Sequence, residues 1–331
     1  MGIFDERIEY KPFEYPIYFT KGWMLQMQAF WLHTEIPMQN DVKDFRENLT
    51  DAERNLVGNI LLGFAQTETA VADYWTGMVT KWFPKHEIKQ MAMAFGSQET
   101  IHAAAYSYLN ETLGLDDFKA FLHEPATAAR FENLVNTKAE YNHSTLKVSP
   151  QARQDVARSI AVFSALAEGV ALYSSFAVLY SFQMRNLLKG IGQQMKWSVR
   201  DESLHSTMGI TLFNQLCEEY PEVRDAVRAE VEEASRLAVQ MEVNFIDKMF
   251  EMGDLENLKA NDLKEFIKKR ANEKLQELGY SAIFEYDKDS AGELDWFYHL
   301  TGGVTHTDFF AMRSTDYSKA NEGEDFESIW D

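Results

Sequence analysis

The amino-acid sequence predicts an all-α protein. Apolar residues recur at helical spacing through most of the chain, and no stretch alternates apolar and polar residues between turn signals as a half-buried strand would. Helix boundary signals also divide the chain into long segments, with a capping box at Thr50 and prolines at Pro84, Pro150 and Pro221. Together, the periodicity and the boundaries favour a set of long packed helices.

Four of these helices have clear ends, and they are expected at about residues 51–83, 86–113, 150–189 and 193–219. The first opens with the capping box Thr50-Asp-Ala-Glu53, and the third opens with the N-cap Ser149 followed by Pro150. Further helices with polar faces are expected at residues 115–148 and 222–279. From about residue 281 the periodicity fades, so we expect a helical domain at 1–312 and a flexible acidic tail at 313–331.

The chain is strongly acidic, with 52 acidic and 32 basic residues among 331 and a formal charge of −20. Such a charge repels phosphate backbones and anionic lipid, so we expect no nucleic-acid partner. Cys217 is the only cysteine, which excludes an intrachain disulfide and favours a reducing, cytoplasmic setting. Because the following glutamates raise a thiol pKa, Cys217 is interpreted as a core residue rather than a nucleophile.

One apolar segment, between Arg158 and Arg185, is long enough to cross a bilayer and carries a single charge at Glu168. No second segment of this kind accompanies it, and the chain around it is highly charged. We therefore interpret it as a helix buried on all sides within a bundle, and we expect no membrane partner.

The strongest chemical signal is a repeated Glu-x-x-His pattern. Glu99 and His102 form the first copy, and Glu202 and His205 form the second. Each copy follows a lone glutamate on the preceding predicted helix, and these two glutamates are Glu68 and Glu168. Such a repeat predicts two helix pairs folded around one centre.

These six residues have the composition of a two-metal site. Residues three apart lie on one helix face, so each Glu-x-x-His pair directs both side chains to the same point. Four carboxylates and two imidazoles are the ligand set of carboxylate-bridged dimetal sites in four-helix bundles, and hard oxygen donors with two nitrogens suit iron or manganese. Four glutamates in one dry core would resist ionising without cations, whereas two divalent ions balance their charge. The competing interpretation is a set of unrelated buried polar residues.

A third Glu-x-x-His copy, Glu140 to His143, serves as an internal control. It lies among polar residues just before the expected break at Ser149 and Pro150, without an apolar helix around it. We interpret it as a surface coincidence.

The six residues stand within three longer motifs, Ser97-Gln-Glu-Thr-Ile-His-Ala-Ala-Ala-Tyr106, Ala167-Glu168 and Arg200-Asp-Glu-Ser-Leu-His205. In order and spacing, the sequence from about Trp31 to its carboxy terminus resembles the small, radical-generating subunit of class I ribonucleotide reductase. The resemblance implies a ferritin-like helical bundle with a dimetal-carboxylate centre in a four-helix core. It also implies the activity of a ribonucleoside-diphosphate reductase beta subunit, which exports an oxidising equivalent to a cysteine of a separate large subunit.

The same resemblance assigns roles to four more residues. Tyr106, one helical turn after His102, matches the tyrosine that holds a stable radical. Trp31 matches the tryptophan of the electron and proton relay, and Asp201 matches the carboxylate that joins this tryptophan to a metal-binding histidine. Tyr317 matches the mobile relay tyrosine. Read without the family, Tyr106 and Trp31 are simply core residues.

The resemblance further implies how the protein assembles. The acidic tail would dock on the large subunit through apolar anchors at Phe326, Ile329 and Trp330, and the chain would form a homodimer. A flavodoxin-like protein is a further expected activator.

Glu68 departs from many members of that family, which have aspartate as the first ligand. Glutamate at this position occurs in subgroups that use manganese, including subgroups that store the oxidising equivalent on the metals. The sequence therefore leaves open whether two manganese ions, two iron ions or one of each bind, and whether Tyr106 holds the radical.

Three other functions remain open at this stage. A ferritin-like oxidase with a small apolar ligand would have little use for the Trp31 and Asp201 relay or for Tyr317. Iron storage predicts a shorter single bundle, and a bare helical scaffold needs no inward glutamates.

Overall fold

A computed structural model describes residues 2–115 and 140–302, and within these ranges the chain is helical and contains no β-strand. The all-α prediction is confirmed. The long helices are α3 (Asp51–Asp73), α5 (His86–Leu113), α9 (Pro150–Ala161), α10 (Tyr173–Met184), α11 (Lys189–Glu219), α12 (Glu222–Met249) and α13 (Ala260–Glu277). The short helices are α1 (Met24–Gln28), α2 (Gln39–Lys43), α4 (Thr80–Trp82), α8 (His143–Val148), α14 (Lys288–Gly292) and α15 (Asp295–Gly302).

Wider π-helical turns and one 3₁₀ turn connect several of these helices. The π-helical segments are η1 (Tyr18–Trp23), η3 (Asp44–Asn48), η4 (Tyr74–Val79) and η5 (Val162–Ala171), and the 3₁₀ turn is η2 (His33–Glu35). Segment η5 joins α9 to α10, so these three form one continuous rod. Segment η4 likewise joins α3 to α4, so the three together correspond to the helix predicted at about residues 51–83.

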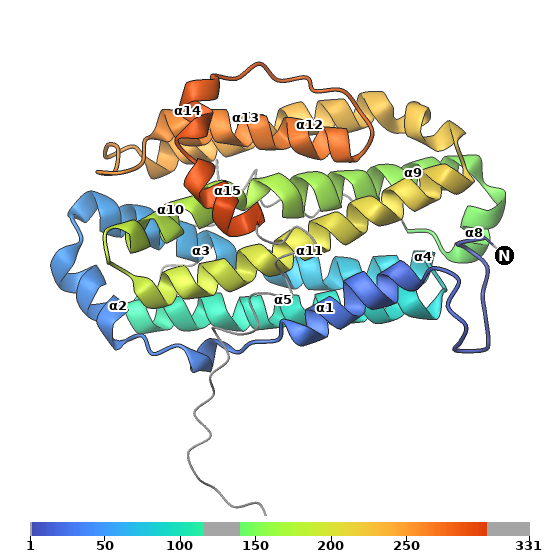
Figure 1. Ribbon diagram of the computed structural model, residues 1–331, viewed down its shortest axis with the longest axis horizontal. Helices are drawn as coiled ribbons and strands as arrows, with labels where there is room; N and C mark the ends of the chain where they lie inside the picture. The colour runs from blue at the N-terminus through green and yellow to red at the C-terminus, as the bar shows by residue number, and fades with distance from the viewer. Residues whose placement is uncertain (1, 116–139, 303–331) are drawn as a thin grey trace, which may run out of the picture.

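Four rods form the core bundle: α3, α5, the α9–η5–α10 rod and α11 (Figure 1). Helix α3 packs along α5, and α11 packs along η5 and α10. Helices α12 and α13 cover the α9–η5–α10 rod from outside, at the top of Figure 1. The predicted pairing of two helix pairs around one centre thus corresponds to α3 with α5 and the α9–η5–α10 rod with α11.

Local signals in the sequence account for most helix ends. The Thr50 side chain accepts from the Glu53 backbone N–H, and the Glu53 carboxylate accepts from the Thr50 N–H at 2.8 Å, so the predicted capping box opens α3. Ser149 caps α9 ahead of Pro150. Gly114 ends α5 with a φ of 77°, a left-handed conformation that favours glycine.

The boundary between the third and fourth helices was predicted wrongly. Helix α10 ends at Met184, not near residue 189, and α11 begins at Lys189, not near residue 193. Asn186 and Leu188 have positive φ, and the buried Asp41 carboxylate accepts from the backbone N–H groups of Gly190 and Ile191. The cap of α11 therefore comes from a residue far away in the sequence, where local pattern reading cannot find it.

The described residues contain one segment long and apolar enough to cross a membrane, Pro150–Met184, and 94% of its most apolar window is buried inside the protein. This is the α9–η5–α10 rod, enclosed by α11, α12 and α13. Burial on all sides explains its composition, as expected from the sequence.

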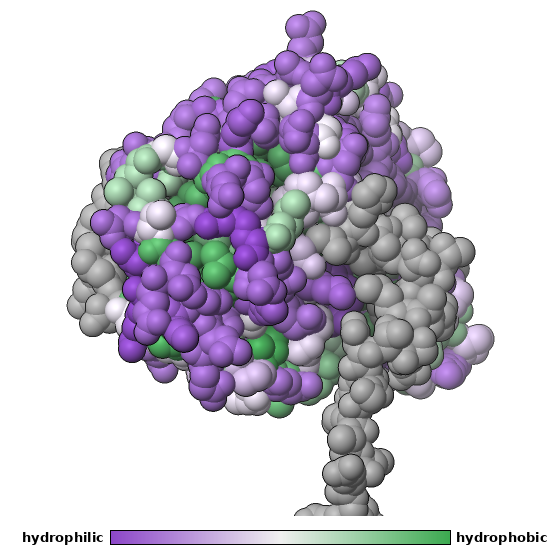
Figure 2. Space-filling model, turned by 60° about the vertical axis from the view of Figure 1, so that its left-hand side comes forward, coloured by the Kyte–Doolittle hydropathy of each residue, from purple (hydrophilic) through white to green (hydrophobic). Residues whose placement is uncertain are grey.

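The face drawn in Figure 2 is mostly hydrophilic, with small scattered apolar areas. Cys217 is buried, and burial raises the pKa of its thiol to about 11, so the prediction of a core cysteine is confirmed.

The third Glu-x-x-His copy is a surface feature, as predicted. Glu140 is exposed, and His143 Nε2 lies 3.3 Å from Glu6 Oε1. The predicted tail lies outside the described residues.

Candidate metal centre

The structure brings all six predicted ligand residues into one buried cluster. Their donor atoms form two overlapping groups, and within each group these atoms lie within 4.8 Å of one another. One group contains Glu68, Glu99, His102 and Glu202, and the other contains Glu99, Glu168, Glu202 and His205. Glu99 and Glu202 belong to both groups, so they are the carboxylates that two ions, if bound, could share.

The two histidines face the cluster in the same way. His102 Nδ1 lies 3.0 Å from Glu99 Oε2 and 3.2 Å from Glu202 Oε1. His205 Nδ1 lies 2.6 Å from Glu99 Oε1. The opposite ring nitrogens contact other partners, since His102 Nε2 is 3.2 Å from Asp201 Oδ2 and His205 Nε2 is 2.9 Å from Gln26 Oε1. Outer partners of this kind fix a histidine tautomer so that the inner nitrogen can bind a metal.

Unpaired oxygen atoms show that the cluster fits metal ions. Both carboxylate oxygens of Glu68, together with Glu168 Oε2 and Glu202 Oε2, are buried without a hydrogen-bond partner. Glu99 Oε1 and Glu202 Oε1 face the histidine nitrogens described above. Buried polar groups are normally paired because an unpaired carboxylate in a dry core costs several kcal/mol. Divalent cations would satisfy all of these oxygens at once.

Burial and mutual repulsion control the charge of the metal-free cluster. Burial raises the pKa values of Glu68 and Glu168 well above the ordinary value for glutamate, and the charges of the neighbouring carboxylates raise them further. Burial, together with Glu99, also raises the pKa of Glu202. Burial alone would raise the pKa of Glu99 too, but His102 and His205 lower it to about 2. His102 is the reverse case, because burial would lower its pKa and the Glu99 charge raises it well above 6.5.

Metal binding is therefore expected to release protons. The raised pKa values of Glu68, Glu168 and His102 favour protonated side chains in the metal-free protein, and two divalent ions would displace these protons. Affinity is therefore expected to rise with pH by about 1.4 kcal/mol per released proton per pH unit. By the same linkage, groups with raised folded-state pKa values stabilise the metal-free fold at low pH, and this contribution is lost as pH rises. Calorimetric titration in buffers of different ionisation enthalpy measures the protons. Binding without proton release would contradict this charge distribution.

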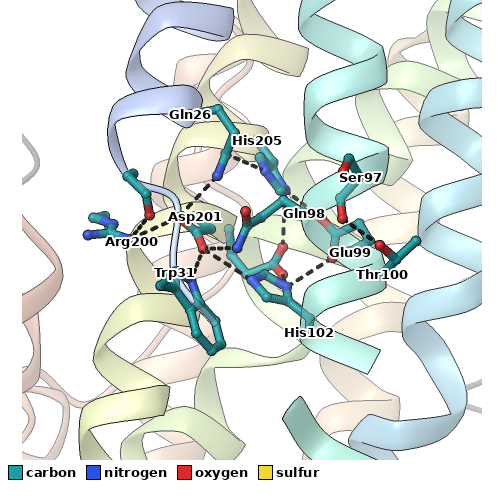
Figure 3. Close-up of polar contacts among 12 residues, drawn as sticks. Gln26, Trp31, Ser97, Gln98, Glu99, Thr100, His102, Arg200, Asp201 and His205 are labelled. Atoms are coloured by element: carbon teal, nitrogen blue, oxygen red, sulfur yellow. Dashed lines mark hydrogen bonds and ion pairs between the residues drawn. The ribbon is translucent and has the colours of Figure 1, made fainter. Parts of the chain in front are cut away.

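Asp201 joins the cluster to Trp31, as the resemblance implied. Trp31 Nε1 donates to Asp201 Oδ2 at 2.7 Å, and the same oxygen lies 3.2 Å from His102 Nε2 (Figure 3). Gln98 Nε2 also donates to it at 2.9 Å. Burial alone would raise the pKa of Asp201, but Arg200 and these hydrogen bonds lower it, so the carboxylate stays charged. One buried carboxylate thus connects an indole to a cluster histidine.

Tyr106 lies one turn beyond His102 on α5, fully buried, with its ring centroid 6.1 Å from that of His102 and 4.8 Å from that of Phe64. Its hydroxyl has no hydrogen-bond partner, and neither do the oxygens of Glu68. Burial raises the pKa of Tyr106 well above its ordinary value, so the phenol is protonated. Tyr317 lies outside the described residues.

Sequence reasoning missed two residues that contact the cluster directly. Trp75, on η4, donates from Nε1 to Glu168 Oε1 at 2.6 Å. Gln26, on α1, is fully buried and bridges His205 to Asp201, with its Nε2 lying 3.4 Å from Asp201 Oδ1. A single polar residue in the apolar run Trp23-Met-Leu-Gln26-Met was the only sequence signal for Gln26. The sequence contains no comparable signal for Trp75.

A third missed contribution comes from α13. Arg270 donates from Nε to the carbonyl oxygen of Gly169, the residue after Glu168, and its guanidinium lies over the Tyr173 ring. A Cβ atom at Gly169 would lie 2.8 Å from Ser206 Oγ and 3.0 Å from a Lys274 carbon. Glycine here lets α11 and α13 contact η5, the π-helical segment that carries Glu168, closely.

A four-helix core with four inward glutamates and two inward histidines defines a helical protein of the dimetal-carboxylate class. The family model for the ribonucleotide reductase small chain matches residues 7–291. A probable ribonucleoside-diphosphate reductase small subunit of Invertebrate iridescent virus 3 is 34% identical over 327 residues, which cover 96% of this chain and 85% of that protein. The subunit beta of Chlamydia pneumoniae is 25% identical, covering 88% and 84%.

Solved structures agree with these sequence matches. The dimanganese(II)-NrdF of Streptococcus sanguinis superposes with a TM-score of 0.71 at 21% identity, covering 86% of this chain and 96% of that one. A putative class I ribonucleotide reductase from Bacillus halodurans also gives 0.71, at 20% identity, covering 86% and 98%. The chain therefore belongs to the ribonucleotide reductase small-chain family, and it is a small subunit of ribonucleoside-diphosphate reductase.

Proposed function

We propose that this small subunit binds two metal ions among its six inward ligand residues and delivers an oxidising equivalent to a cysteine of the large subunit. The observation that carries the proposal is the set of buried, unpaired carboxylate oxygens, which two cations would neutralise. The ligands are Glu68, Glu99, His102, Glu168, Glu202 and His205.

Each remaining site residue has a defined part in this proposal. When bound, the two ions would supply the oxidising power. Tyr106 is close enough to His102 to give up an electron and hold the radical, and its burial protects it from solvent. Asp201 holds the Trp31 indole and the His102 ring in one hydrogen-bonded line, with ring centroids 5.7 Å apart. A ligand-binding oxidase has no use for this line, so we favour the reductase.

The proposed ions are manganese, iron or one of each. Glu68 is a longer ligand than aspartate, and neither of its oxygens pairs with Tyr106. A solved relative is described as dimanganese(II), which supports including manganese. The position of the oxidising equivalent, on Tyr106 or on the ions, is the part of the proposal that most needs a measurement.

Loading the metal-free protein anaerobically with Fe(II), Mn(II) or both, followed by oxidation and electron paramagnetic resonance, tests the proposal. A tyrosyl doublet that disappears in Tyr106→Phe would place the radical on Tyr106. A multiline signal that survives in Tyr106→Phe would place the oxidising equivalent on the ions. Absence of stoichiometric metal binding would overturn the proposal as a whole.

We also propose that the chain forms a homodimer and that a flavodoxin-like protein activates it. Residues 313–331 are proposed to dock on the large subunit, where Tyr317 would complete the relay. Removing this tail is expected to abolish turnover with a large subunit while leaving two ions bound, because every proposed ligand lies before residue 206. Metal analysis and ribonucleoside-diphosphate reduction assays measure the two effects. Full turnover by the truncated chain would refute docking through the tail.

A further inference from the structure

Helices α5 and α11 meet in an antiparallel seam that continues past the metal cluster. His102 of α5 contacts Asp201 of α11. One turn further along α5 and about one turn back along α11, the antiparallel register places Tyr106 opposite Ser198. Continuing this register by one more turn places Asn110 of α5 opposite Gln194 of α11. The seam therefore runs from the cluster through Tyr106 to a pair of amide side chains.

All four polar residues in this extension are fully buried: Tyr106, Asn110, Gln194 and Ser198. The hydroxyls of Tyr106 and Ser198, both amide atoms of Gln194, and Asn110 Oδ1 have no hydrogen-bond partner. Burial raises the pKa of Tyr106, and Ser198 is one of the neighbours that oppose this rise. Buried groups of this kind are costly unless they pair with one another.

The donors and acceptors of these residues complement each other. The amide nitrogen of Asn110 already donates to the carbonyl oxygens of Leu61 and Tyr106, which holds its Oδ1 as a free acceptor. The Gln194 amide nitrogen has two hydrogens, one for Asn110 Oδ1 and one for Ser198 Oγ. The Ser198 hydroxyl, once it accepts from Gln194, is free to donate to the Tyr106 oxygen.

We propose that Ser198 is the hydrogen-bond partner of the Tyr106 oxygen and that Gln194 and Asn110 hold the Ser198 hydroxyl in place. Ser198 is a positioning residue, since it acts on Tyr106 and contacts no metal ligand atom in this role. The importance of this bond for redox chemistry rests on the proposed function, because a hydrogen bond at the phenol oxygen controls how readily Tyr106 loses an electron. The bond itself does not depend on bound metal.

Carbon-13 NMR of the metal-free, full-length protein labelled at tyrosine Cζ tests the bond directly. The Tyr106 resonance is the one lost in Tyr106→Phe. It is expected to shift in Ser198→Ala and to shift less, in the same direction, in Gln194→Met. Ser235→Ala is the matched control, because Ser235 on α12 is also fully buried with an unpaired hydroxyl. A Tyr106 resonance that is unchanged in Ser198→Ala would overturn the inference.

A second measurement separates this inference from the proposed function. In metal-loaded, oxidised protein, a Tyr106 doublet with a deuterium-exchangeable coupling that is lost in Ser198→Ala would support both. If no doublet forms but the NMR shift occurs, the radical assignment to Tyr106 fails and the hydrogen bond stands. If the doublet forms and neither the coupling nor the NMR shift depends on Ser198, the inference fails and the radical assignment stands.

Discussion

Glu99→Gln is expected to abolish stoichiometric binding of two divalent ions while the metal-free protein stays folded. Glu99 belongs to both overlapping ligand groups and is the carboxylate that both histidines approach, so its loss weakens both ion sites. An amide also cannot provide the negative charge that a hard cation requires. Metal analysis and thermal unfolding with and without Mn(II) or Fe(II) measure the effect. At a metal concentration of about 100 times Kd, the wild-type protein should gain about 2.7 kcal/mol that the variant lacks.

Glu140→Gln is the control for this substitution. Glu140 has the same spacing to a histidine, but it is exposed and lies outside both ligand groups, so its replacement should leave metal content and metal-dependent stabilisation unchanged. Two ions bound by Glu99→Gln with wild-type affinity would contradict the assignment of Glu99 as a shared ligand.

Asp201→Asn is expected to lower turnover with a large subunit by about 10–100-fold or more while the ions remain bound. Asp201 Oδ2 accepts from Trp31 and Gln98 and faces His102, and an amide nitrogen at that position would oppose these donors instead of accepting from them. The neutral side chain also removes the charge that holds the His102 ring. Steady-state assays together with the rate of tryptophan oxidation after metal loading measure the loss.

Asp41→Asn distinguishes loss of the relay from general destabilisation. Asp41 is a second buried carboxylate that holds α11, but it acts at the far N-terminal end, at Gly190 and Ile191. Its replacement is expected to cost about 0.5–2 kcal/mol of stability, as for other helix caps, with turnover retained in the folded protein. Equal losses of turnover in the Asp41 and Asp201 variants would indicate a structural role for Asp201.

Much of the fold was predictable because its signals are local. The capping box at Thr50, the cap at Ser149 and the glycine after Leu113 each act within a few residues of the boundary they define. The π-helical turns were not predictable, because a widened turn leaves the apolar periodicity almost unchanged. Within η5, the Gly169 carbonyl oxygen accepts from Arg270, which lies on a helix about a hundred residues later.

The six-residue cluster was predictable for a related reason. Residues three apart lie on the same face of a helix, so the sequence alone predicts that Glu99 and His102 point to one site, and that Glu202 and His205 do as well. The contrast with Glu140 also came from sequence, since the apolar character of the surrounding helix separates a buried pair from an exposed one. The relay through Asp201 followed only from the family resemblance.

By itself, then, the sequence determined the helical class, most helix boundaries, the six clustered residues and the family. Only the tertiary structure decided which residues contact them from elsewhere in the chain: Gln26 contacts His205, Trp75 contacts Glu168, and Asp41 holds the start of α11. Backbone geometry explains this division. Within one helix, residue spacing sets side-chain direction, whereas contacts between helices depend on packing register, which no local pattern encodes.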